Sequence, residues 1–341
     1  MTSAPTWPAK ASLTASTWPR RQFLGAALAA PWLGAAAPAA LAAGEDLSKV
    51  TLRIGTYKGN WRALLTAAKL TQTPYKIEWR ELNNGVLHIE ALNGDALDLG
   101  SGSEIPALFA ARQKAQVRFI AVVREDLNNQ VTVARKDSGI RTIADLKGKR
   151  VGYVRATTAH YFLSKQLAEA GLGFSDINAI NLSPADGLSA FDRGDLDAWA
   201  IYGYNGQIAR LKYGARVLKT GVGYLSGNFP IYANPKSVSD PLTQLAITDY
   251  LQRLRRAYLW ANQNYLDYAR AISDETRIPV GDLIELWNNR SEDFDLRPVS
   301  DKVVTGHQDV ADTFQKLGVL DGPAQVAPLW DRRFDKVLRP A

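Results

Sequence analysis

Four short segments of the sequence combine glycine with hydroxyl, amide or aromatic side chains, each where a strand pattern gives way to a helix pattern. Such segments favour anion binding, because the first N–H groups of a helix have no acceptor within it and hydroxyl groups add further donors. The candidate ligand-binding residues of the first two segments are Lys58, Gly59, Asn60, Ser101, Gly102 and Glu104. Those of the other two are Arg155, Thr157, Thr158, His160, Trp199, Tyr202 and Tyr204.

Each segment also has a purely structural interpretation. Ser, Thr and Asn are ordinary helix caps, and Glu104 could simply oppose a helix dipole. His160 could be a packing residue one turn into a helix, and Trp199 and Tyr202 could belong to the core. The functional interpretation rests on the occurrence of four such segments in one chain.

Catalytic patterns are missing from the sequence. It has no Cys, no Gly-x-Ser-x-Gly motif, and only three, widely separated histidines. It also has no glycine-rich dinucleotide motif and no His, Asp and Glu cluster at metal-ligand spacing. We therefore expect a protein that is not an enzyme and that uses neither a cofactor nor a metal ion.

The elements that must position these segments form two successive α/β units, typical of parallel sheets. In the first unit, strand patterns cover 50–56, 75–82, 97–100 and 117–123, and helix patterns cover 61–70, 85–92 and 105–112. In the second, strand patterns cover 149–154, 177–182 and 197–202, and helix patterns cover 159–170, 186–192 and 205–213. Helical periodicity dominates 242–317.

This order predicts two lobes with a hinge and a helical C-terminal part. We expect lobe 1 to comprise 47–133 and 228–320 and lobe 2 to comprise 134–227, with a tail at 321–341 and a strand crossing back near 226–235. Ligands of open α/β sheets bind beyond the carboxyl ends of the strands, and two of the four segments fall in each unit. Closure of the lobes would therefore bring all four onto one small ligand.

The N-terminal segment has the pattern of an export signal. Residues 1–42 contain Lys10, Arg20 and Arg21 but no acid, and an Ala-rich apolar run follows to Leu41. The pair of arginines before Gln-Phe-Leu matches a twin-arginine signal, and small residues predict cleavage after Ala42 or at the next position. An uncleaved membrane anchor is the alternative, although prolines interrupt the weakly apolar run.

Removal of that segment changes the charge balance. The 341 residues carry a net charge of +7, with 41 basic and 34 acidic residues, and cleavage removes three of the basic ones. The mature 299 residues would carry +4, which gives no reason to expect a nucleic-acid partner.

Without Cys there is no lipid anchor on an N-terminal Cys. We expect a soluble, monomeric protein in the periplasm.

Several motifs resemble those of the substrate-binding proteins of ABC transporters for aliphatic sulfonates, within the wider sulfonate, taurine and nitrate group. The most recognisable is Ile-Ala-Asp-Leu-Lys-Gly-Lys-Arg-Val at 143–151. The others lie at 52–55, 58–60, 90–93, 97–100, 160–163, 184–191 and 194–199, so the resemblance runs along nearly the whole mature chain to about residue 320.

The resemblance implies a type II periplasmic binding fold whose lobes close on a sulfonate and present it to a membrane permease and ATPase. A sulfonate is a permanent anion with three acceptor oxygens, which suits the helix ends and hydroxyls. Its organic body would lie against Trp199, Tyr202, Tyr204 and Trp61. A sulfinate desulfinase with the same fold needs a catalytic Cys, which this chain does not have.

The sequence departs from the family at two of the four segments. Tyr202-Gly203-Tyr204 stands where the family usually has Trp-Asp-Pro, and Arg-Ala-Thr-Thr at 155–158 replaces a Lys-Gly-Ser-Asn type of sequence. The added aromatic surface suggests a larger or aromatic organosulfur ligand. Taurine, a sulfate ester, nitrate or an aromatic carboxylate remain alternatives, and Glu104 is the candidate partner for an ammonium group such as that of taurine.

Overall fold

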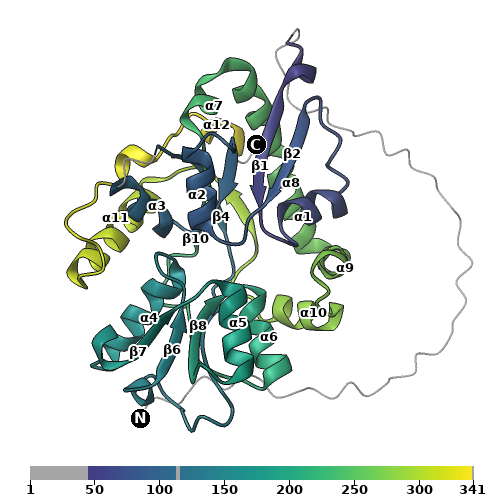
Figure 1. The fold of residues 1–341 in the computed structure, drawn as a ribbon. Helices are drawn as coiled ribbons and strands as arrows, with labels where there is room; N and C mark the ends of the chain where they lie inside the picture. Colours follow the sequence, from purple (N-terminus) through teal and green to yellow (C-terminus); the bar gives the residue numbers. More distant parts are fainter. Residues whose placement is uncertain (1–44, 113–115, 340–341) are drawn as a thin grey trace, which may run out of the picture. The chain divides into compact units, whose positions relative to one another are not determined.

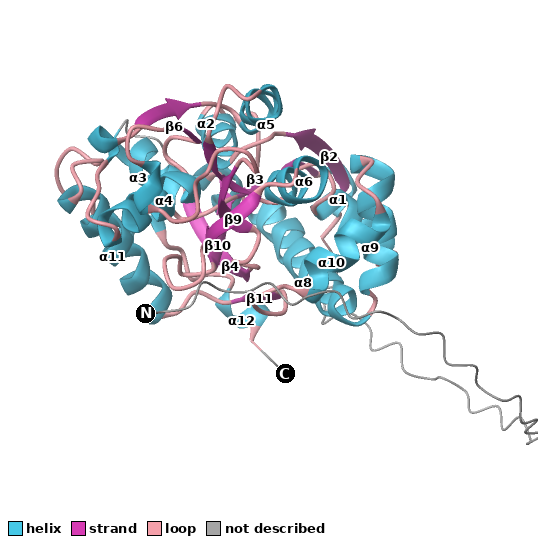
Figure 2. Cartoon of the chain, turned by 90° about the horizontal axis from the view of Figure 1, so that it is seen from below, coloured by secondary structure: helices cyan, strands magenta, loops and turns pink. Residues whose placement is uncertain are grey.

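The strands of the protein form two separate sheets. A computed structural model describes residues 45–112 and 116–339 (Figures 1 and 2). Within them, the predicted alternation of strands and helices is confirmed in both α/β units. The predicted signal segment, residues 1–42, lies outside the described residues.

The first sheet has the strand order β11-β4-β10-β3-β1-β2. Its strands are β1 (Thr51–Thr56), β2 (Lys76–Glu81), β3 (Leu99–Ser101), β4 (Arg118–Arg124), β10 (Asn228–Ala233) and β11 (Asp295–Arg297). β1 is parallel to β2 and β3, and β10 is antiparallel to both β3 and β4. It follows that β4 runs in the same direction as β1 and β3, so their carboxyl ends lie at one edge of the sheet.

The second sheet has the order β7-β6-β8-β5-β9. Its strands are β5 (Gln130–Ala134), β6 (Arg150–Tyr153), β7 (Asn178–Asn181), β8 (Ala198–Tyr202) and β9 (Arg216–Thr220). β6 is parallel to β7 and β8, whereas β5 is antiparallel to β8 and β9. The sequence pattern did not predict β5 and β9, which lie outside the alternation of strands and helices that it followed: β5 comes directly after β4, and β9 leads into the crossing segment 221–227.

The chain crosses between the sheets twice. It leaves the first sheet after Arg124 and returns to it at Asn228, which confirms the strand predicted near 226–235. The two crossing segments contact each other, since Glu125 N donates to Gly227 O at 3.2 Å. The predicted bounds of the two lobes remain a prediction. β5, which straddles the predicted boundary at 133/134, pairs with strands of the second sheet.

Helices cover the sheets and extend the C-terminal part (Figure 1). They are α1 (Trp61–Ala67), α2 (Gly85–Asn93), α3 (Ile105–Arg112), α4 (Thr158–Glu169), α5 (Pro184–Arg193), α6 (Tyr204–Tyr213), α7 (Pro235–Ser239), α8 (Pro241–Gln263), α9 (Tyr265–Thr276), α10 (Val280–Asn288), α11 (Asp301–Lys316) and α12 (Asp335–Leu338). The predicted tail also contacts the first sheet, because Trp330 forms a β-bridge with Phe119 of β4.

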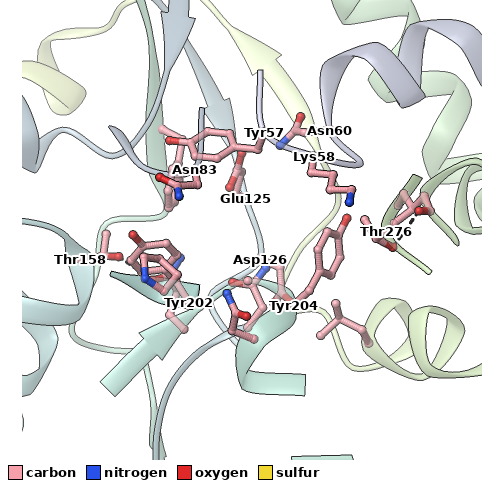
Figure 3. Close-up of a pocket in the computed structure, with 18 of the residues that line it drawn as sticks. Tyr57, Lys58, Asn60, Asn83, Glu125, Asp126, Thr158, Tyr202, Tyr204 and Thr276 are labelled. Atoms are coloured by element: carbon pink, nitrogen blue, oxygen red, sulfur yellow. Dashed lines mark hydrogen bonds between the residues drawn. The ribbon is translucent and has the colours of Figure 1, made fainter. Parts of the chain in front are cut away.

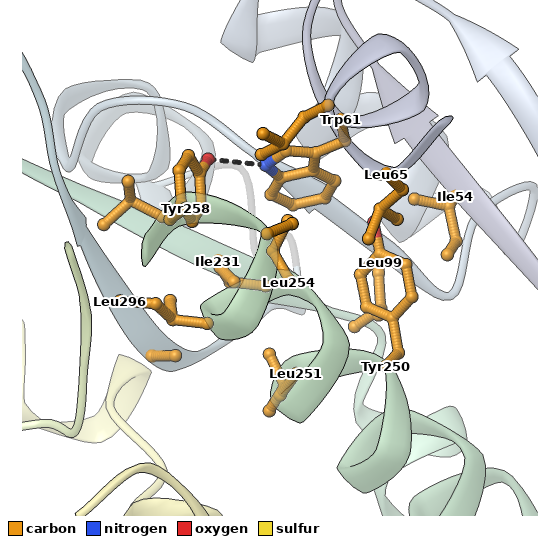
Figure 4. Close-up of a cluster of buried hydrophobic side chains, with 14 of the residues drawn as sticks. Ile54, Trp61, Leu65, Leu99, Ile231, Tyr250, Leu251, Leu254, Tyr258 and Leu296 are labelled. Carbon is orange, nitrogen blue, oxygen red and sulfur yellow. Dashed lines mark hydrogen bonds between the residues drawn. The ribbon is translucent and has the colours of Figure 1, made fainter. Parts of the chain in front are cut away.

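A large hydrophobic core lies between α8 and the first sheet (Figure 4). Leu251 and Leu254 of α8 are fully buried and pack in the same cluster as Ile54 of β1. The indole Nε1 of Trp61 donates to the hydroxyl of Tyr258 at 2.9 Å, so its polar atom is satisfied inside this core. Trp61 is therefore a core residue, and the structure does not place it on the wall of the candidate site.

Candidate functional site

A cavity of about 660 Å³ is lined by residues of both sheets and of the C-terminal helices (Figure 3). Its volume lies within the usual range for small-molecule sites. Loops that follow strands supply most of its polar groups, and α9 and α10 supply much of its apolar wall. This is the candidate functional site.

The direction of the strands explains why these loops meet. β1, β3 and β4 end at one edge of the first sheet, where Ser101 at the end of β3 and the loop residues Lys58 and Glu125 line the cavity. β6 and β8 are parallel, and they lead into Thr157 and Tyr202-Gly203-Tyr204. The site therefore lies at carboxyl strand ends, where α/β proteins bind their ligands.

Eight of the thirteen predicted site residues line the cavity. They are Lys58, Asn60, Ser101, Gly102, Thr157, Thr158, Tyr202 and Tyr204. Five do not, namely Gly59, Glu104, Arg155, His160 and Trp199. The structure thus brings one or more residues from each of the four predicted segments to a single cavity, and their part in binding remains a prediction.

Gly59 and Arg155 do not line the cavity, and their backbone N–H groups bind elsewhere in the protein. Gly59 has a φ of +73°, which favours glycine, and its N–H donates to the Oε2 atom of Glu275 at 2.9 Å. Arg155 is exposed, and its N–H donates to the side-chain oxygen of Asn181 at 2.9 Å.

Trp199 and His160 are packing residues in this structure. Trp199 is fully buried in β8, where its ring lies near that of Phe191. His160 is buried against the rings of Tyr153 and Phe174. Burial, with a smaller contribution from Arg155, lowers the pKa of His160 to about 4, so its imidazole is neutral at pH 7.

Glu104 lies behind the cavity wall. It is buried at the start of α3, and its Oε1 atom accepts a hydrogen bond from the Ser226 hydroxyl at 2.8 Å. Burial raises the pKa of Glu104 to about 7, while Ser226 and Arg124 act in the opposite direction. Its contact with the crossing segment 221–227 is structural.

The turn after β3 presents the first set of donors. Ser101 N donates to His88 Nδ1 at 3.1 Å, and the hydroxyl of Tyr57 donates to the Ser101 carbonyl at 3.0 Å. A Cβ at Gly102 would lie 2.5 Å from the Tyr232 hydroxyl, so only glycine fits between that ring and the cavity. These contacts hold the Ser101 backbone at the cavity wall, just before α3.

The start of α4 presents the second set. Thr157 Oγ1 donates to the Val154 carbonyl and Thr158 Oγ1 to the Gln130 side chain, both at 2.7 Å. Both hydroxyl protons are therefore used within the protein. The free backbone N–H groups of the first turn of α4 are the donors that remain for a ligand.

Aromatic and aliphatic side chains form the rest of the wall. Tyr202 and Tyr204 flank Gly203, whose φ of +67° lets the chain turn directly from β8 into α6. Ile272, Leu283 and Trp287 come from α9 and α10, far away in the sequence. The sequence predicted helices there, but no local signal shows which helix face meets the cavity.

The charged groups of the cavity are balanced in sign. Lys58 is exposed to solvent, and Arg290 forms an ion pair with Asp293. Glu125 and Asp126 also line the cavity, although the sequence analysis did not single them out. They follow β4, which leads into a loop and then β5 rather than into a helix, so they lie outside the strand-to-helix segments that the sequence pattern marks.

The two acids differ in their partners. Asp126 Oδ1 accepts from the backbone N–H groups of Asn128 and Ser291, at 2.8 and 2.9 Å. Within residues 45–112 and 116–339, no hydrogen bond or ion pair reaches the Glu125 carboxylate. Burial, and next the neighbouring Asp126, raises the pKa of Glu125 to about 7.

The described part of the chain shows neither a metal-binding cluster nor a membrane-spanning helix. No three His, Asp or Glu side chains gather there in a way that could hold a metal ion. Among the same residues, no helix is both long and apolar enough to cross a membrane.

The NMT1/THI5-like family model matches residues 76–266. A curated protein of Escherichia coli (strain K12), named for the binding of aliphatic sulfonates, is 31% identical over 284 residues, which is 80% of this chain and 86% of that protein. The alkanesulfonate-binding protein SsuA of Xanthomonas axonopodis pv. citri, solved with bound MOPS, superposes with a TM-score of 0.75 at 29% identity. That match covers 83% of this chain and 98% of the other.

The periplasmic aliphatic sulphonate binding protein SsuA from Escherichia coli superposes with a TM-score of 0.71 at 28% identity, over 81% of this chain and 90% of the other. Both solved structures confirm the two-lobed periplasmic binding fold that the sequence predicts. The desulfurization enzyme DSZB is a more distant neighbour, with a TM-score of 0.60 at 15% identity over 84% of this chain and 97% of the enzyme. At that identity the likeness concerns the fold alone.

Proposed function

The chain belongs to the NMT1/THI5-like family, and from this premise we propose that it is an extracytoplasmic receptor that captures an organosulfonate between its two lobes. One observation carries the proposal: the turn before α3 and the start of α4 reach the same cavity from different sheets. Helix N-termini and hydroxyl groups suit the three oxygens of a sulfonate. The apolar wall suits its organic body.

The relatives support the choice of ligand over the alternatives from the same fold. Those reported above are named for sulfonates rather than for nitrate or carboxylates. We propose that the protein is not an enzyme, since the chain has no Cys to serve the sulfinate chemistry of a desulfinase. Its partners would be the permease and ATPase subunits of an ABC importer.

We further propose export through the twin-arginine signal at residues 1–42, cleavage after Ala42 or at the next position, and function as a monomer in the periplasm. The export test fuses residues 1–50 to a reporter that is active only after folding in the cytoplasm and export. Replacement of Arg20 and Arg21 by Lys should abolish export. Export that survives this change would contradict the twin-arginine proposal.

A thermal-shift screen of the mature protein tests the binding function. Alkanesulfonates, arylsulfonates, taurine, sulfate esters, nitrate and aromatic carboxylates would be compared at equal concentration. A ligand at about 100 times its Kd should stabilise the fold by about 2.7 kcal/mol. Stabilisation by nitrate or a carboxylate, with none by any sulfonate, would overturn the proposal.

A further inference from the structure

The candidate site holds an acid that a receptor for simple anions does not need. Glu125 follows β4 and points into the cavity between Tyr57 and Asp126 in Figure 3. In the described part of the chain no basic side chain pairs with it, and Arg290 of the same cavity is paired with Asp293. An ionised Glu125 would repel a ligand that carries only negative charge.

Aromatic rings surround this carboxylate. Glu125 lies close enough to raise the pKa values of Tyr57, Tyr204 and Tyr258, although burial is the main cause in each case. Tyr204 and Tyr258 line the cavity with it, as do Phe229 and Phe294. A carboxylate within a wall of aromatic rings is a favourable environment for an organic ammonium group, which gains both an ion pair and cation–π contacts.

Glu125 also lies within reach of the anion-binding turn. The ring of Tyr57 connects the two places, because its hydroxyl donates to the Ser101 carbonyl at 3.0 Å while Glu125 lies beside the ring in Figure 3. A ligand with a short spacer could therefore place a negative group at Ser101 and the start of α4, and a positive group at Glu125. The charges of such a ligand match the charges of the cavity.

We propose that Glu125 binds a protonated amine of the ligand, so that the preferred substrates are zwitterionic aminosulfonates with an apolar substituent on nitrogen. This inference rests on the proposed sulfonate-binding function and names the substrate class of the same cavity. The substituent fills the wall formed by α9 and α10, where Ile272, Leu283 and Trp287 lie. Selectivity would follow from the pairing of opposite charges rather than from the sulfonate alone.

Isothermal titration calorimetry at pH 7.5 with a matched pair of ligands tests the inference. The first ligand is 2-(cyclohexylamino)ethanesulfonate, whose secondary amine is protonated at neutral pH. The second is 3-cyclohexylpropane-1-sulfonate, in which a CH2 group replaces the charged nitrogen. We expect the mature wild-type protein to bind the amine at least about tenfold more tightly, as a buried charge-assisted pair implies.

The variant Glu125→Gln should remove this preference. It should raise the Kd for 2-(cyclohexylamino)ethanesulfonate about tenfold or more, while 3-cyclohexylpropane-1-sulfonate binds as well as before or better. Glu90→Gln makes the same chemical change on the exposed face of α2 and serves as the control. Equal affinity of the wild-type protein for both ligands, or equal weakening of both by Glu125→Gln, would overturn the role of Glu125 and leave sulfonate binding intact. Failure of every sulfonate to bind would instead overturn the proposed function.

Discussion

The guanidinium Nη2 of Arg210 in α6 lies 2.6 Å from Oε1 of Glu285 in α10, so an ion pair joins the two sides of the cavity. α6 packs against the second sheet, whereas α10 packs against α9 on the side of the first sheet. Beside this pair, Gln207 Nε2 donates to the Asp282 carbonyl at 3.2 Å. Both contacts therefore join α6 to α10 across the cavity.

A double-mutant cycle at this pair should show coupling to ligand binding. We expect Arg210→Met and Glu285→Gln each to weaken sulfonate binding a few-fold, because each removes a contact of the enclosed form. The coupling energy should be about 0.2–1 kcal/mol, since both side chains are partly exposed to solvent. Calorimetric Kd values for the wild type, two single variants and the double variant provide it. Additive effects would show that the pair does not act as a unit.

Ser101→Ala should weaken sulfonate binding without loss of stability. Its hydroxyl lines the cavity, and its backbone contacts with His88 and Tyr57 do not involve the side chain. A lost hydrogen bond to a charged ligand group should raise Kd about tenfold. Denaturant unfolding should give an unchanged midpoint, and an unchanged Kd would remove Ser101 from the binding site.

Thr157→Ala should instead lower stability, because the Thr157 hydroxyl satisfies the Val154 carbonyl at 2.7 Å in a buried environment. We expect a loss of about 1–3 kcal/mol in the free energy of unfolding. Thr157→Ser keeps the donor and is the matched control, so it should recover most of that loss. Equal destabilisation by Ala and Ser would assign the effect to the methyl group.

Glu104 should make stability fall as pH rises. Burial raises its pKa in the folded protein to about 7 from an ordinary 4.5, so the protonated form is favoured on folding. The stabilisation is complete below pH 4.5 and is lost as pH rises to about 7, by about 3 kcal/mol at most. Glu104→Gln has no such titration, so it should be increasingly more stable than the wild type over this range.

The comparison must be made as a difference between the two proteins. Buried His88 and His307, whose pKa values are lowered to about 4 and about 3, act in the opposite direction as pH falls. Their contributions cancel when urea unfolding of the wild type and Glu104→Gln is measured at the same pH values. A difference that stays constant between pH 4.5 and 8 would contradict the expectation.

Two glycines in helices should respond to alanine with opposite signs. A Cβ at Gly187 in α5 would lie 2.7 Å from Trp199 Cζ2, whereas nothing lies within 4 Å of a Cβ at Gly306 in α11. Gly306→Ala should therefore stabilise the protein by about 0.5–1 kcal/mol through helix propensity. Gly187→Ala should destabilise it by about 1–3 kcal/mol through overpacking. Thermal unfolding distinguishes the two, and equal signs would contradict the packing around Trp199.

The rule that ligands lie beyond carboxyl strand ends found most of the polar wall of the cavity from the sequence. It worked because strand direction and loop position follow from the local βα order. It failed where side-chain direction decides the outcome. Trp199 and Tyr202 are three positions apart in β8, so they point to opposite faces, and Trp199 packs against Phe191 in the core.

The rest of the site depends on contacts that no local pattern records. α9 reaches the cavity through packing against α1, far away in the sequence, and α10 packs against α9 and α6. Glu125 is a different case, since its strand was predicted and its acidic side chain was overlooked. β4 leads into a loop rather than into a helix, so Glu125 lay outside the four strand-to-helix segments.

Because the chain crosses between the sheets twice, the second α/β unit is inserted into the first as one continuous segment. Arg124 and Asn228 face each other across β4 and β10, and Val131 and Thr220 face each other across β5 and β9. Both ends of the intervening segment therefore meet, as the ends of inserted domains do. Exchange of the segment between Val131 and Thr220 by recombination would replace Thr158 and Tyr202 with another relative's residues, while Ser101 and Glu125 stay in place. New ligand ranges could thus be assembled from existing halves, without a new fold.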